Sequence, residues 1–539
     1  MTMLTKWGAA LDRSCPLPEY PRPQLRRESF YNLNGVWDYA VTPSGDEPEV
    51  WDGEIVVAFS PEAPLSGAAR GPAKDEYLHY RRGFTLPEGF QKSRVLLHFG
   101  AVDQIAEVFV NGVSAAKHSG GYWPFSADIT SLLREGENIL RVTVRDNADD
   151  PTFAYGKQRY KRGGMWYTAQ SGIWQTVWLE SVPEVYVKSL RITPEFDEAR
   201  VRIELETALE SSAAITCDVR AADGSFVAGS WAKGGVCVVP LPGFRAWTPD
   251  DPYLYTLDIT CGEDRVESYF AMRKFSYVEL GGHKVFGLNN APLFHNGLLD
   301  QGYYPDGLLT PPSDEAMVND IETMKRCGFN MLRKHIKIEP LRWYYHCDRL
   351  GMIVWQDMVS GGQPYSFLHV SALPTLGKVD LPDQDAKPYG RSGVLSRARF
   401  RREMADTVRL LYNCPCIALW TVFNEGWGQF DALDMANELK KLDPTRFIDH
   451  ASGWQDQGYE EMKSRHIYFR PVKLKNDGRA LALTEYGGYI LAVDGHRWTD
   501  KVFGYRICRD SAALAHDYEK LMLGQVLPHI RKEGLTRSE

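Results

Sequence analysis

A change in hydrophobic periodicity at about residue 280 is the feature that most restricts how this chain can fold. Before it, apolar and polar residues alternate with period two in short runs, as in residues 94–100 and 105–110, which is the pattern of strands with one buried face. After it, short apolar runs alternate with amphipathic helical stretches, which is typical of parallel β/α units. We therefore expect β-sandwich structure first and a parallel β/α domain second.

The region before this change divides into two predicted all-β domains. Residues 1–183 contain regularly spaced strands and turn signals, and Asn111-Gly112 within residues 108–113 predicts a hairpin with a type I′ turn. This spacing favours a β-sandwich. Residues 184–279 also alternate with period two, as in residues 200–205, and their length fits an immunoglobulin-like sandwich.

Residues 280–539 predict a (β/α)8 barrel with an incomplete end. We expect its strands at residues 292–299, 329–335, 352–357, 416–425, 446–451, 465–469 and 480–486. Convincing helices are expected at residues 314–327, 339–350, 395–412, 429–442 and 511–530, and the helices after the fifth and sixth strands are short or missing. A barrel of this type has eight strands, whereas the sequence predicts seven. The sequence stops at residues 532–539, where the eighth should begin, so we expect the last unit to be missing.

Composition excludes several classes of function. The 539 residues are 44% apolar and 24% charged with a net charge of −8, which argues against nucleic acid or an anionic membrane as the main partner. We find neither a membrane-spanning apolar run nor a signal peptide. Nine cysteines, an odd number, suit reduced thiols in the cytoplasm. The 15 Trp, 27 Tyr and 23 Phe favour carbohydrate as a ligand, although aromatic sandwich cores would give the same excess.

Two predicted barrel strands, the fourth and the seventh, end in a glutamate. The fourth strand ends at Asn424-Glu425, directly after an apolar run (residues 420–423). The seventh strand, residues 481–485, ends at Glu485, and glycines follow it. Catalytic groups of such barrels lie at the carboxyl ends of the strands. Most glutamates are exposed surface residues without a special role, but that explanation fits poorly for a glutamate at the end of an apolar strand. Two opposed carboxylates are what glycosidic cleavage needs: one protonates the leaving oxygen, and the other attacks the anomeric carbon or activates water.

Together with these two strand ends, further motifs make nearly the whole chain resemble glycoside hydrolase family 2, which includes β-galactosidases, β-glucuronidases and β-mannosidases. The motifs that carry the resemblance are spread over all three regions: Leu33-Asn-Gly-Val-Trp-Asp38, residues 108–112 (VFVNG), residues 170–180 (QSGIWQTVWLE), residues 247–255 (WTPDDPYLY), residues 272–275 (MRKF), residues 328–333 (GFNMLR) and residues 413–425 (NCPCIALWTVFNE). The family implies a sugar-binding-like jelly roll, an immunoglobulin-like sandwich and a catalytic barrel.

By that resemblance, Glu425 is the acid/base and Glu485 the nucleophile of a retaining double displacement through a covalent glycosyl-enzyme. Their carboxyl groups are then expected about 5 Å apart. Asn424 would hydrogen-bond the sugar 2-hydroxyl, or it could only support the strand end. The implied enzyme is an exo-acting β-glycosidase without a cofactor, which acts on a terminal β-linked sugar, most readily a β-galactoside or β-glucuronide, and forms a homo-oligomer.

Further residues are weaker candidates for substrate binding, because each has an equally plain structural explanation: Asp300, His335, His466, Tyr468 and Trp498. Tyr468 could hydrogen-bond the nucleophile and Trp498 could stack on a sugar face, or both could be core aromatics. Arg333 is expected to pair with a carboxylate at the barrel mouth rather than to bind substrate.

The sequence also departs from the family pattern. Residues 413–415 read Asn-Cys-Pro where the family has Asn-His-Pro, and residues 355–358 (WQDM) lack the usual Asp-Glu pair. These departures leave no basis for a magnesium site, and the glycone stays open among galactose, glucuronic acid, galacturonic acid, mannose and arabinopyranose.

The sequence leaves two other functions open. A metal-dependent barrel hydrolase could use His295, His335 and His466, although no His-x-His or paired cysteine spacing supports it. A non-catalytic carbohydrate-binding protein could also combine two sandwiches with an incomplete barrel, although both glutamates are present.

Overall fold

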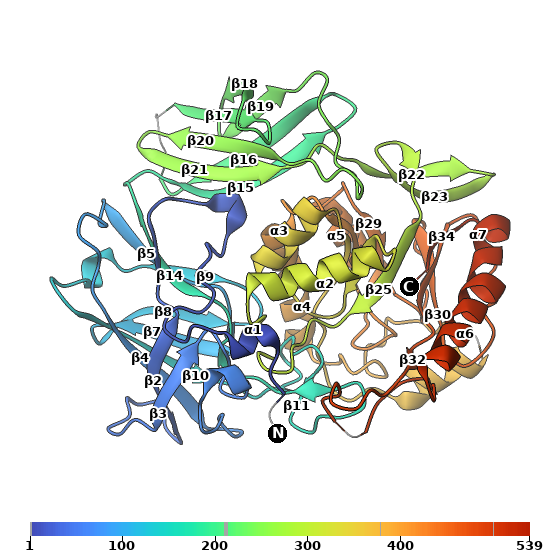
Figure 1. The fold of residues 1–539 in the computed structure, drawn as a ribbon, viewed down its shortest axis with the longest axis horizontal. Helices are drawn as coiled ribbons and strands as arrows, with labels where there is room; N and C mark the ends of the chain where they lie inside the picture. Colours follow the sequence, from blue (N-terminus) through green and yellow to red (C-terminus); the bar gives the residue numbers. More distant parts are fainter. Residues whose placement is uncertain (1–2, 210–213, 378, 500, 539) are drawn as a thin grey trace.

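The computed structural model describes residues 3–209, 214–377, 379–499 and 501–538. Its chain forms two β-sandwiches beside one barrel (Figure 1). The first sandwich, coloured blue to cyan, and the barrel, coloured yellow to red, lie side by side, and the green second sandwich lies above them. A short three-stranded sheet of β22 (Phe275–Leu280), β23 (His283–Leu288) and β24 (Ala291–Pro292) leads from the second sandwich into the barrel.

The first sandwich has a four-stranded sheet and a six-stranded sheet. The first is β1 (Phe30–Asn32), β14 (Val177–Val182), β5 (Arg94–Phe99) and β9 (Phe125–Asp128). The second is β3 (Gly53–Val57), β2 (Gly35–Thr42), β4 (Tyr77–Phe84), β10 (Asn138–Arg145), β7 (Ile105–Val110) and β8 (Val113–Ser119). Side chains from both sheets, such as Leu97 and Trp37, share one apolar core. The predicted hairpin is confirmed: Val110 pairs with Val113, and Asn111 and Gly112 both have positive φ angles.

The second sandwich packs a three-stranded sheet on a four-stranded sheet. These are β15 (Val187–Glu195), β16 (Arg200–Thr207) and β19 (Val236–Pro240), and β18 (Phe226–Trp231), β17 (Ile215–Arg220), β20 (Tyr255–Cys261) and β21 (Asp264–Phe270). Val201 and Ile203 of one sheet and Val219 and Leu257 of the other are buried together. Two-stranded ladders complete the β structure: β6 (Val102–Asp103) with β13 (Gly172–Ile173), β11 (Gln158–Arg159) with β12 (Tyr167–Thr168), and β32 (Tyr489–Ile490) with β33 (Arg506–Ile507).

The barrel is built on a sheet of eight strands whose hydrogen-bonded neighbours are all parallel. In chain order they are β25 (His295–Asp300), β26 (Met331–Lys334), β27 (Ile353–Asp357), β28 (Ile417–Thr421), β29 (Phe447–Asp449), β30 (Met462–Ile467), β31 (Ala480–Tyr486) and β34 (Leu535–Ser538). Strands β26, β27 and β28 are buried along their whole length, as strands covered on both faces must be.

The expectation that the last barrel unit is missing is wrong for its strand, which is present. The eighth strand, β34, pairs with both β31 and β25 and so lies between the seventh and the first strands. It is short and carries a single aliphatic residue, Leu535, so it has no apolar run by which the sequence alone could reveal it. On the opposite side, Ser464 of β30 links β30 to β29 by donating its hydroxyl to Asp449 Oδ1 at 3.0 Å.

The barrel helices begin and end near the predicted positions. They are α2 (Asp314–Arg326), α3 (Leu341–Leu350), α4 (Val394–Leu411), α5 (Ala432–Leu442), α6 (Ser511–Leu521) and α7 (Leu527–Glu533), while α1 (Lys6–Ala9) is a single turn near the start of the chain. Ser313 caps α2 by accepting a bond from the Ala316 N–H, and α3 ends where Gly351 takes a left-handed conformation, as helix signals of this kind predict.

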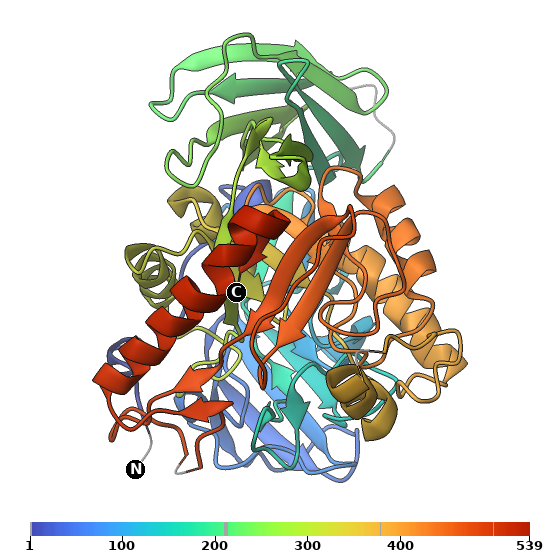
Figure 2. The ribbon, with the colours of Figure 1, turned by 90° about the vertical axis from the view of Figure 1, so that its right-hand side faces the viewer.

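The last predicted helix is interrupted. A π-helical turn, Met522–Val526, separates α6 from α7, and Pro528, which has no N–H, lies just after it. Figure 2 shows this red helical segment crossing the outside of the barrel beside the orange strands. Residues 450–461 and 468–479, all of which the structure describes, form no helix, as expected after the fifth and sixth strands.

The fold class is thus confirmed as two β-sandwiches and a (β/α)8 barrel, with the eighth strand present. A search of the described residues found no helix with the length and apolarity needed to span a membrane.

Candidate active site

Glu425 lies beyond the end of β28 in an unusual backbone conformation. Its φ angle is +51°, a left-handed conformation that non-glycine residues adopt at an energetic cost and that recurs at functional sites. The neighbouring segment after β29 holds it there, since Glu425 N–H donates to the Ser452 carbonyl at 3.0 Å. The side chain is 22% exposed, and its Oε1 lies 2.8 Å from His466 Nδ1.

Glu485 lies at the end of β31, almost fully buried among cationic and hydroxyl groups. Arg333 Nη1 donates to its Oε1 at 3.0 Å, and the Tyr468 hydroxyl donates to its Oε2. Burial raises the pKa of Glu485, but the nearby His466, Arg333 and His335 and the Tyr468 hydroxyl outweigh burial and lower the pKa to about 2. Glu485 is therefore a carboxylate at any physiological pH.

His466 connects the two glutamates. While its Nδ1 hydrogen-bonds Glu425, its Nε2 lies 3.5 Å from Glu485 Oε1 and 3.2 Å from Ser452 Oγ. One oxygen of Glu425, one ring nitrogen of His466 and one oxygen of Glu485 lie within 4.8 Å of one another. The fold thus brings the two predicted catalytic carboxyl groups into one site.

Arg333 organises the floor of this site. It is fully buried and donates three hydrogen bonds: Nη1 to Glu485, Nε to Asp357 Oδ1 at 2.9 Å and Nη2 to Asn424 Oδ1 at 2.8 Å. The expected ion pair of Arg333 with a carboxylate at the barrel mouth is present. The bond to Asn424 Oδ1 leaves the Asn424 Nδ2 group as the donor available to a ligand.

Asp357, which the sequence analysis did not select, holds a second predicted residue. Its Oδ2 lies 2.8 Å from His335 Nδ1. Burial raises the pKa of Asp357, but Arg333 and His335 more than offset this effect and hold it well below its ordinary value. Asp357 closes the apolar strand β27, the same signal that selected the two glutamates.

The pocket in front of Glu425 is lined mainly by residues that the sequence analysis missed: Lys157, Met165, Trp166, Ile336, Tyr365, Val370, Ser371, Trp427 and Trp454, besides Asn424 and Glu425. Lys157 comes from the first sandwich. Burial lowers its pKa more than the charges of Glu485 and Glu425 raise it, so the pKa lies below its ordinary value. Among the described residues its ammonium group has no hydrogen-bond or ion-pair partner. A long loop rich in basic and aromatic residues, 155–166, was the signal that could have drawn attention to it.

Two predicted binding residues make contacts with side chains other than the glutamates. Asp300 Oδ2 pairs with Lys334 Nζ at 2.9 Å. Trp498 is 45% exposed and lies under the Arg162 guanidinium at 5.6 Å. Neither is among the residues that line the pocket in front of Glu425. Their roles in substrate binding stay predictions.

The alternative metal site of three histidines does not assemble. His295 begins β25, whereas His335 follows the end of the paired strand β26, in register beyond Asp300. Five residues of strand separate these levels by roughly 16 Å. Glu425, His466 and Glu485 are close enough to hold an ion in principle, but an ion would have to displace the hydrogen bond between Glu425 and His466.

Comparison with known proteins identifies the family. Three family models match consecutive parts of the chain: the sugar binding domain of glycosyl hydrolases family 2 at residues 62–183, glycosyl hydrolases family 2 at residues 185–273, and the family 2 TIM barrel domain at residues 311–474. The chain belongs to glycoside hydrolase family 2. The resemblance stated from the sequence motifs is confirmed.

Individual relatives of this family 2 chain are distant. It is 25% identical over 387 residues to a β-galactosidase of Thermoanaerobacter pseudethanolicus, a match that covers 68% of this chain and 47% of the relative. It is 22% identical over 536 residues to a β-glucuronidase of Paenibacillus borealis, covering 88% and 85%. The chain spans about half or less of the first three curated relatives, at 47%, 45% and 37% of their lengths.

A solved β-glucuronidase from an uncultured Clostridium species has the same fold, with a TM-score of 0.73 at 19% identity, over 95% of this chain and 91% of that one. At this identity the likeness supports the fold alone.

Proposed function

We propose that this family 2 chain is an exo-acting retaining β-glycosidase that hydrolyses terminal β-galactosides or β-glucuronides. The relatives named above as β-galactosidase and β-glucuronidase support the reaction class. The arrangement of Glu425 and Glu485 supports the mechanism.

The observation that carries the proposal is the spacing of the two carboxyl groups. One oxygen of Glu425 and one oxygen of Glu485 lie within 4.8 Å of each other. Retaining glycosidases hold their carboxyl groups about 5–5.5 Å apart, whereas inverting enzymes need about 6.5–9.5 Å to admit a water molecule. The site therefore suits direct attack by one carboxylate on the sugar.

In the first step, Glu485 attacks the anomeric carbon while Glu425 transfers a proton to the glycosidic oxygen, so that the aglycone leaves as an alcohol. Glu485 is suited to the attack because its pKa of about 2 keeps it ionised. In the second step, Glu425 removes a proton from water, the water oxygen attacks the anomeric carbon, and Glu485 leaves as a carboxylate.

The neighbours of the two glutamates position them and the substrate. Arg333 and Tyr468 fix both oxygens of Glu485, and His466 orients Glu425. Asn424, whose Oδ1 is held by Arg333, directs Nδ2 to the sugar 2-hydroxyl. His335 contacts a further glycone hydroxyl through Nε2, because its Nδ1 faces Asp357.

Hydrolysis of a panel of p-nitrophenyl β-glycosides tests the proposal, with Glu485→Gln as the blank. We expect release from the galactoside or the glucuronide and none from the blank, since an amide is not a nucleophile. Release that persists in the blank, or silence across the panel for a chain extended at its C-terminus, would contradict it.

Three further expectations belong to the same proposal. The domains are residues 1–183, 184–279 and 280–539, the working form is a homo-oligomer by analogy with the family, and the enzyme acts in the cytoplasm without a cofactor. All nine cysteines are free thiols in the described chain, which suits a reducing compartment.

A further inference from the structure

A pocket with a strongly basic lining lies where the chain that follows β30 passes beside β31. It is a cavity of about 190 Å³. The irregular segment 468–479 takes the place here of the helix that follows a strand in a regular β/α unit. The charged residues that line the pocket are five basic ones and a single acidic one: Lys463, Arg465, Arg470, Lys473, Lys475 and Asp380.

Two of the five basic residues are neutralised by neighbouring carboxylates. Lys463 Nζ pairs with Asp477 at 2.9 Å, and Arg465 Nη2 pairs with Asp380 at 3.2 Å. Asp477 also pairs with Arg479 at 2.8 Å, so its charge is already shared between two cations. These carboxylates therefore leave the other three basic residues of the lining unbalanced.

The other three are Arg470, Lys473 and Lys475, and all of them are exposed. Among the described residues, none of the three forms a salt bridge with an acidic side chain. Arg470 Nη1 reaches the Thr375 carbonyl only at 3.5 Å, the outer limit of a hydrogen bond. Burial alternates along residues 472–475, with the two lysines at the exposed positions, so both ammonium groups are accessible on the same side of the segment. A ligand can reach all three cations.

The walls of the pocket strengthen the effect of these charges. Ile467, Leu474 and Leu481 also line it and are buried. A concave surface with apolar walls and one sign of charge focuses the electric field and concentrates ions of the opposite sign. The chain as a whole has a net charge of −8, so the attraction for anions is a local property of this lining.

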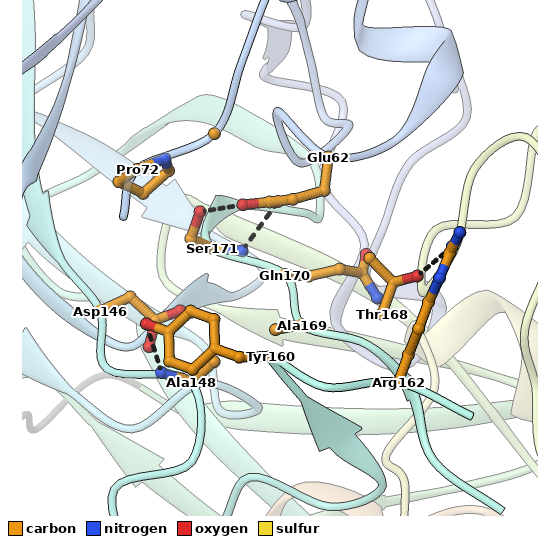
Figure 3. Close-up of a pocket in the computed structure, with 11 residues that line it drawn as sticks. Glu62, Pro72, Asp146, Ala148, Tyr160, Arg162, Thr168, Ala169, Gln170 and Ser171 are labelled. Carbon is orange, nitrogen blue, oxygen red and sulfur yellow. Dashed lines mark hydrogen bonds between the residues drawn. The ribbon is translucent and has the colours of Figure 1, made fainter. Parts of the chain in front are cut away.

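A larger cavity in the first sandwich, of about 300 Å³, has a different character (Figure 3). Its charged lining residues are two carboxyl groups, Glu62 and Asp146, and one arginine, Arg162. Figure 3 shows Glu62 bonded to Ser171, and Arg162 donating to Thr168 Oγ1 at 3.0 Å. That cavity does not suit an anion, so a basic lining is not general to the cavities of this chain.

The basic pocket adjoins the active site but is separate from it. His466 lines it, and Trp454 lines both this pocket and the pocket in front of Glu425. None of the five basic residues of the lining belongs to the pocket in front of Glu425. The two sites therefore share a wall and use different charged groups.

A tetrahedral oxyanion fits this set of groups. Phosphate and sulfate carry several acceptor oxygens, which pair with guanidinium and ammonium groups through charge-assisted hydrogen bonds. The cavity is smaller than the roughly 300–1,000 Å³ of ordinary small-molecule sites, so it suits one anionic group with its nearest water molecules rather than a whole oligosaccharide.

We propose that the pocket lined by Arg470, Lys473 and Lys475 binds a phosphate or sulfate group, either as the free ion or as an ester on a sugar. The proposal goes beyond the glycosidase activity and does not depend on it, since the site lies outside the catalytic pocket.

Isothermal titration of the full chain with sodium phosphate and with sodium sulfate tests the site, at an ionic strength held constant with sodium chloride. We expect one ion per chain. The double variant Lys473→Gln/Lys475→Gln should weaken binding by roughly two- to thirty-fold, since each exposed ion pair contributes modestly. Absence of binding to the parent chain, or an unchanged affinity in the double variant, would overturn the proposal.

A second double variant, Lys92→Gln/Lys441→Gln, controls for the change in net charge. It also removes two exposed lysines, which lie outside the pocket lining, and its affinity should equal that of the parent chain. Equal weakening in both double variants would mean that net charge and not this pocket attracts the anion, and would overturn the proposal. If the melting temperature shows that Lys473→Gln/Lys475→Gln does not fold, Arg470→Gln replaces it, with an expected weakening of roughly two- to five-fold.

Titration with glucose 6-phosphate and galactose 6-sulfate distinguishes the two sources of the anion. Tighter binding of the esters than of the free ions, weakened in Lys473→Gln/Lys475→Gln, would identify a sugar ester as the ligand. Tighter binding of the free ions, weakened in the same variant, would identify the ion. Because binding is measured and not turnover, a chain that cleaves no glycoside still gives a result at this site.

Discussion

Replacement of Tyr468 by Phe isolates the contribution of one hydroxyl to the ionisation of the nucleophile. The hydroxyl donates to Glu485 Oε2, and burial followed by the Glu485 charge raises the pKa of Tyr468 well above its usual value, so it remains a donor at working pH. Phenylalanine keeps the ring, which stacks on Tyr505 at 3.8 Å, and removes only the donor.

The expected size of the effect follows from the hydrogen bond that is lost. A hydrogen bond to a charged group is worth about 1.5–3 kcal/mol, and one pKa unit is about 1.4 kcal/mol. Loss of the donor destabilises the carboxylate, so the pKa of Glu485 should rise from about 2 to roughly 3–4. Glu485 must be ionised to attack, so activity is lost as the pH falls through this pKa.

The pH dependence of kcat/KM on the best p-nitrophenyl glycoside measures this shift, because it reports the groups of the free enzyme. The acid limb should move upward by about one to two pH units in Tyr468→Phe. Tyr344→Phe is the control: its hydroxyl is buried too but donates to Gln356 Oε1 at 2.6 Å, so the acid limb of this variant should stay in place. Equal shifts in both variants, or none in Tyr468→Phe, would refute the assigned role.

The remaining predictions concern the acid/base Glu425, the glycine beside His466, the half-buried Lys157 and stability at acid pH. Glu425→Ala should spare the first step for aryl groups that leave readily but slow deglycosylation, with rescue by azide; equal loss for every leaving group would exclude its role. Gly453→Ala should reduce activity and lower the melting temperature, since a Cβ there would lie 2.3 Å from His466 Cγ. Lys157→Met should shift the acid limb of the kcat/KM profile to higher pH, because the lysine charge favours the ionised form of Glu485. An acid limb at the same pH as in the parent chain would mean that the charge of Lys157 does not affect Glu485. Because the folded-state pKa of Glu485 is lowered, its contribution to stability is complete above about pH 4.5 and lost as the pH falls towards 2, so Glu485→Gln should flatten the acid dependence of urea unfolding between these values.

Regular elements with a strong pattern could be predicted from the sequence. The seventh strand, β31, has the predicted limits of residues 480–486, because an apolar run ends there at a carboxylate and glycines follow. Strand β34 could not be predicted in this way. Its only apolar residue is Leu535, and its strand conformation depends on the open hydrogen-bonding edges of β25 and β31, which come from segments far away in the sequence.

The same distinction applies to the site. Glu425 and Glu485 were found because each follows an apolar strand, and Asp357 offered the same signal. Lys157 has no such local signature. Its position depends on how the first sandwich packs on the barrel, where the Gly156 N–H donates to the Ser360 carbonyl at 2.9 Å and the Tyr155 hydroxyl to the Gly362 carbonyl at 2.7 Å. Contacts between segments some 200 residues apart leave no periodic trace in either segment.

If Glu485 is the nucleophile, it becomes glycosylated during turnover, and this glycosyl-enzyme can be trapped. The chain would be incubated with a dinitrophenyl 2-deoxy-2-fluoro-β-glycoside of the sugar that the panel identifies, because the fluorine slows breakdown of the glycosyl-enzyme, and the peptides would then be analysed by mass spectrometry. We expect one fluoroglycosyl group per chain, on the peptide that contains Glu485, and none in Glu485→Gln. A label on Glu425, or turnover with inversion at the anomeric carbon and no label at all, would contradict it.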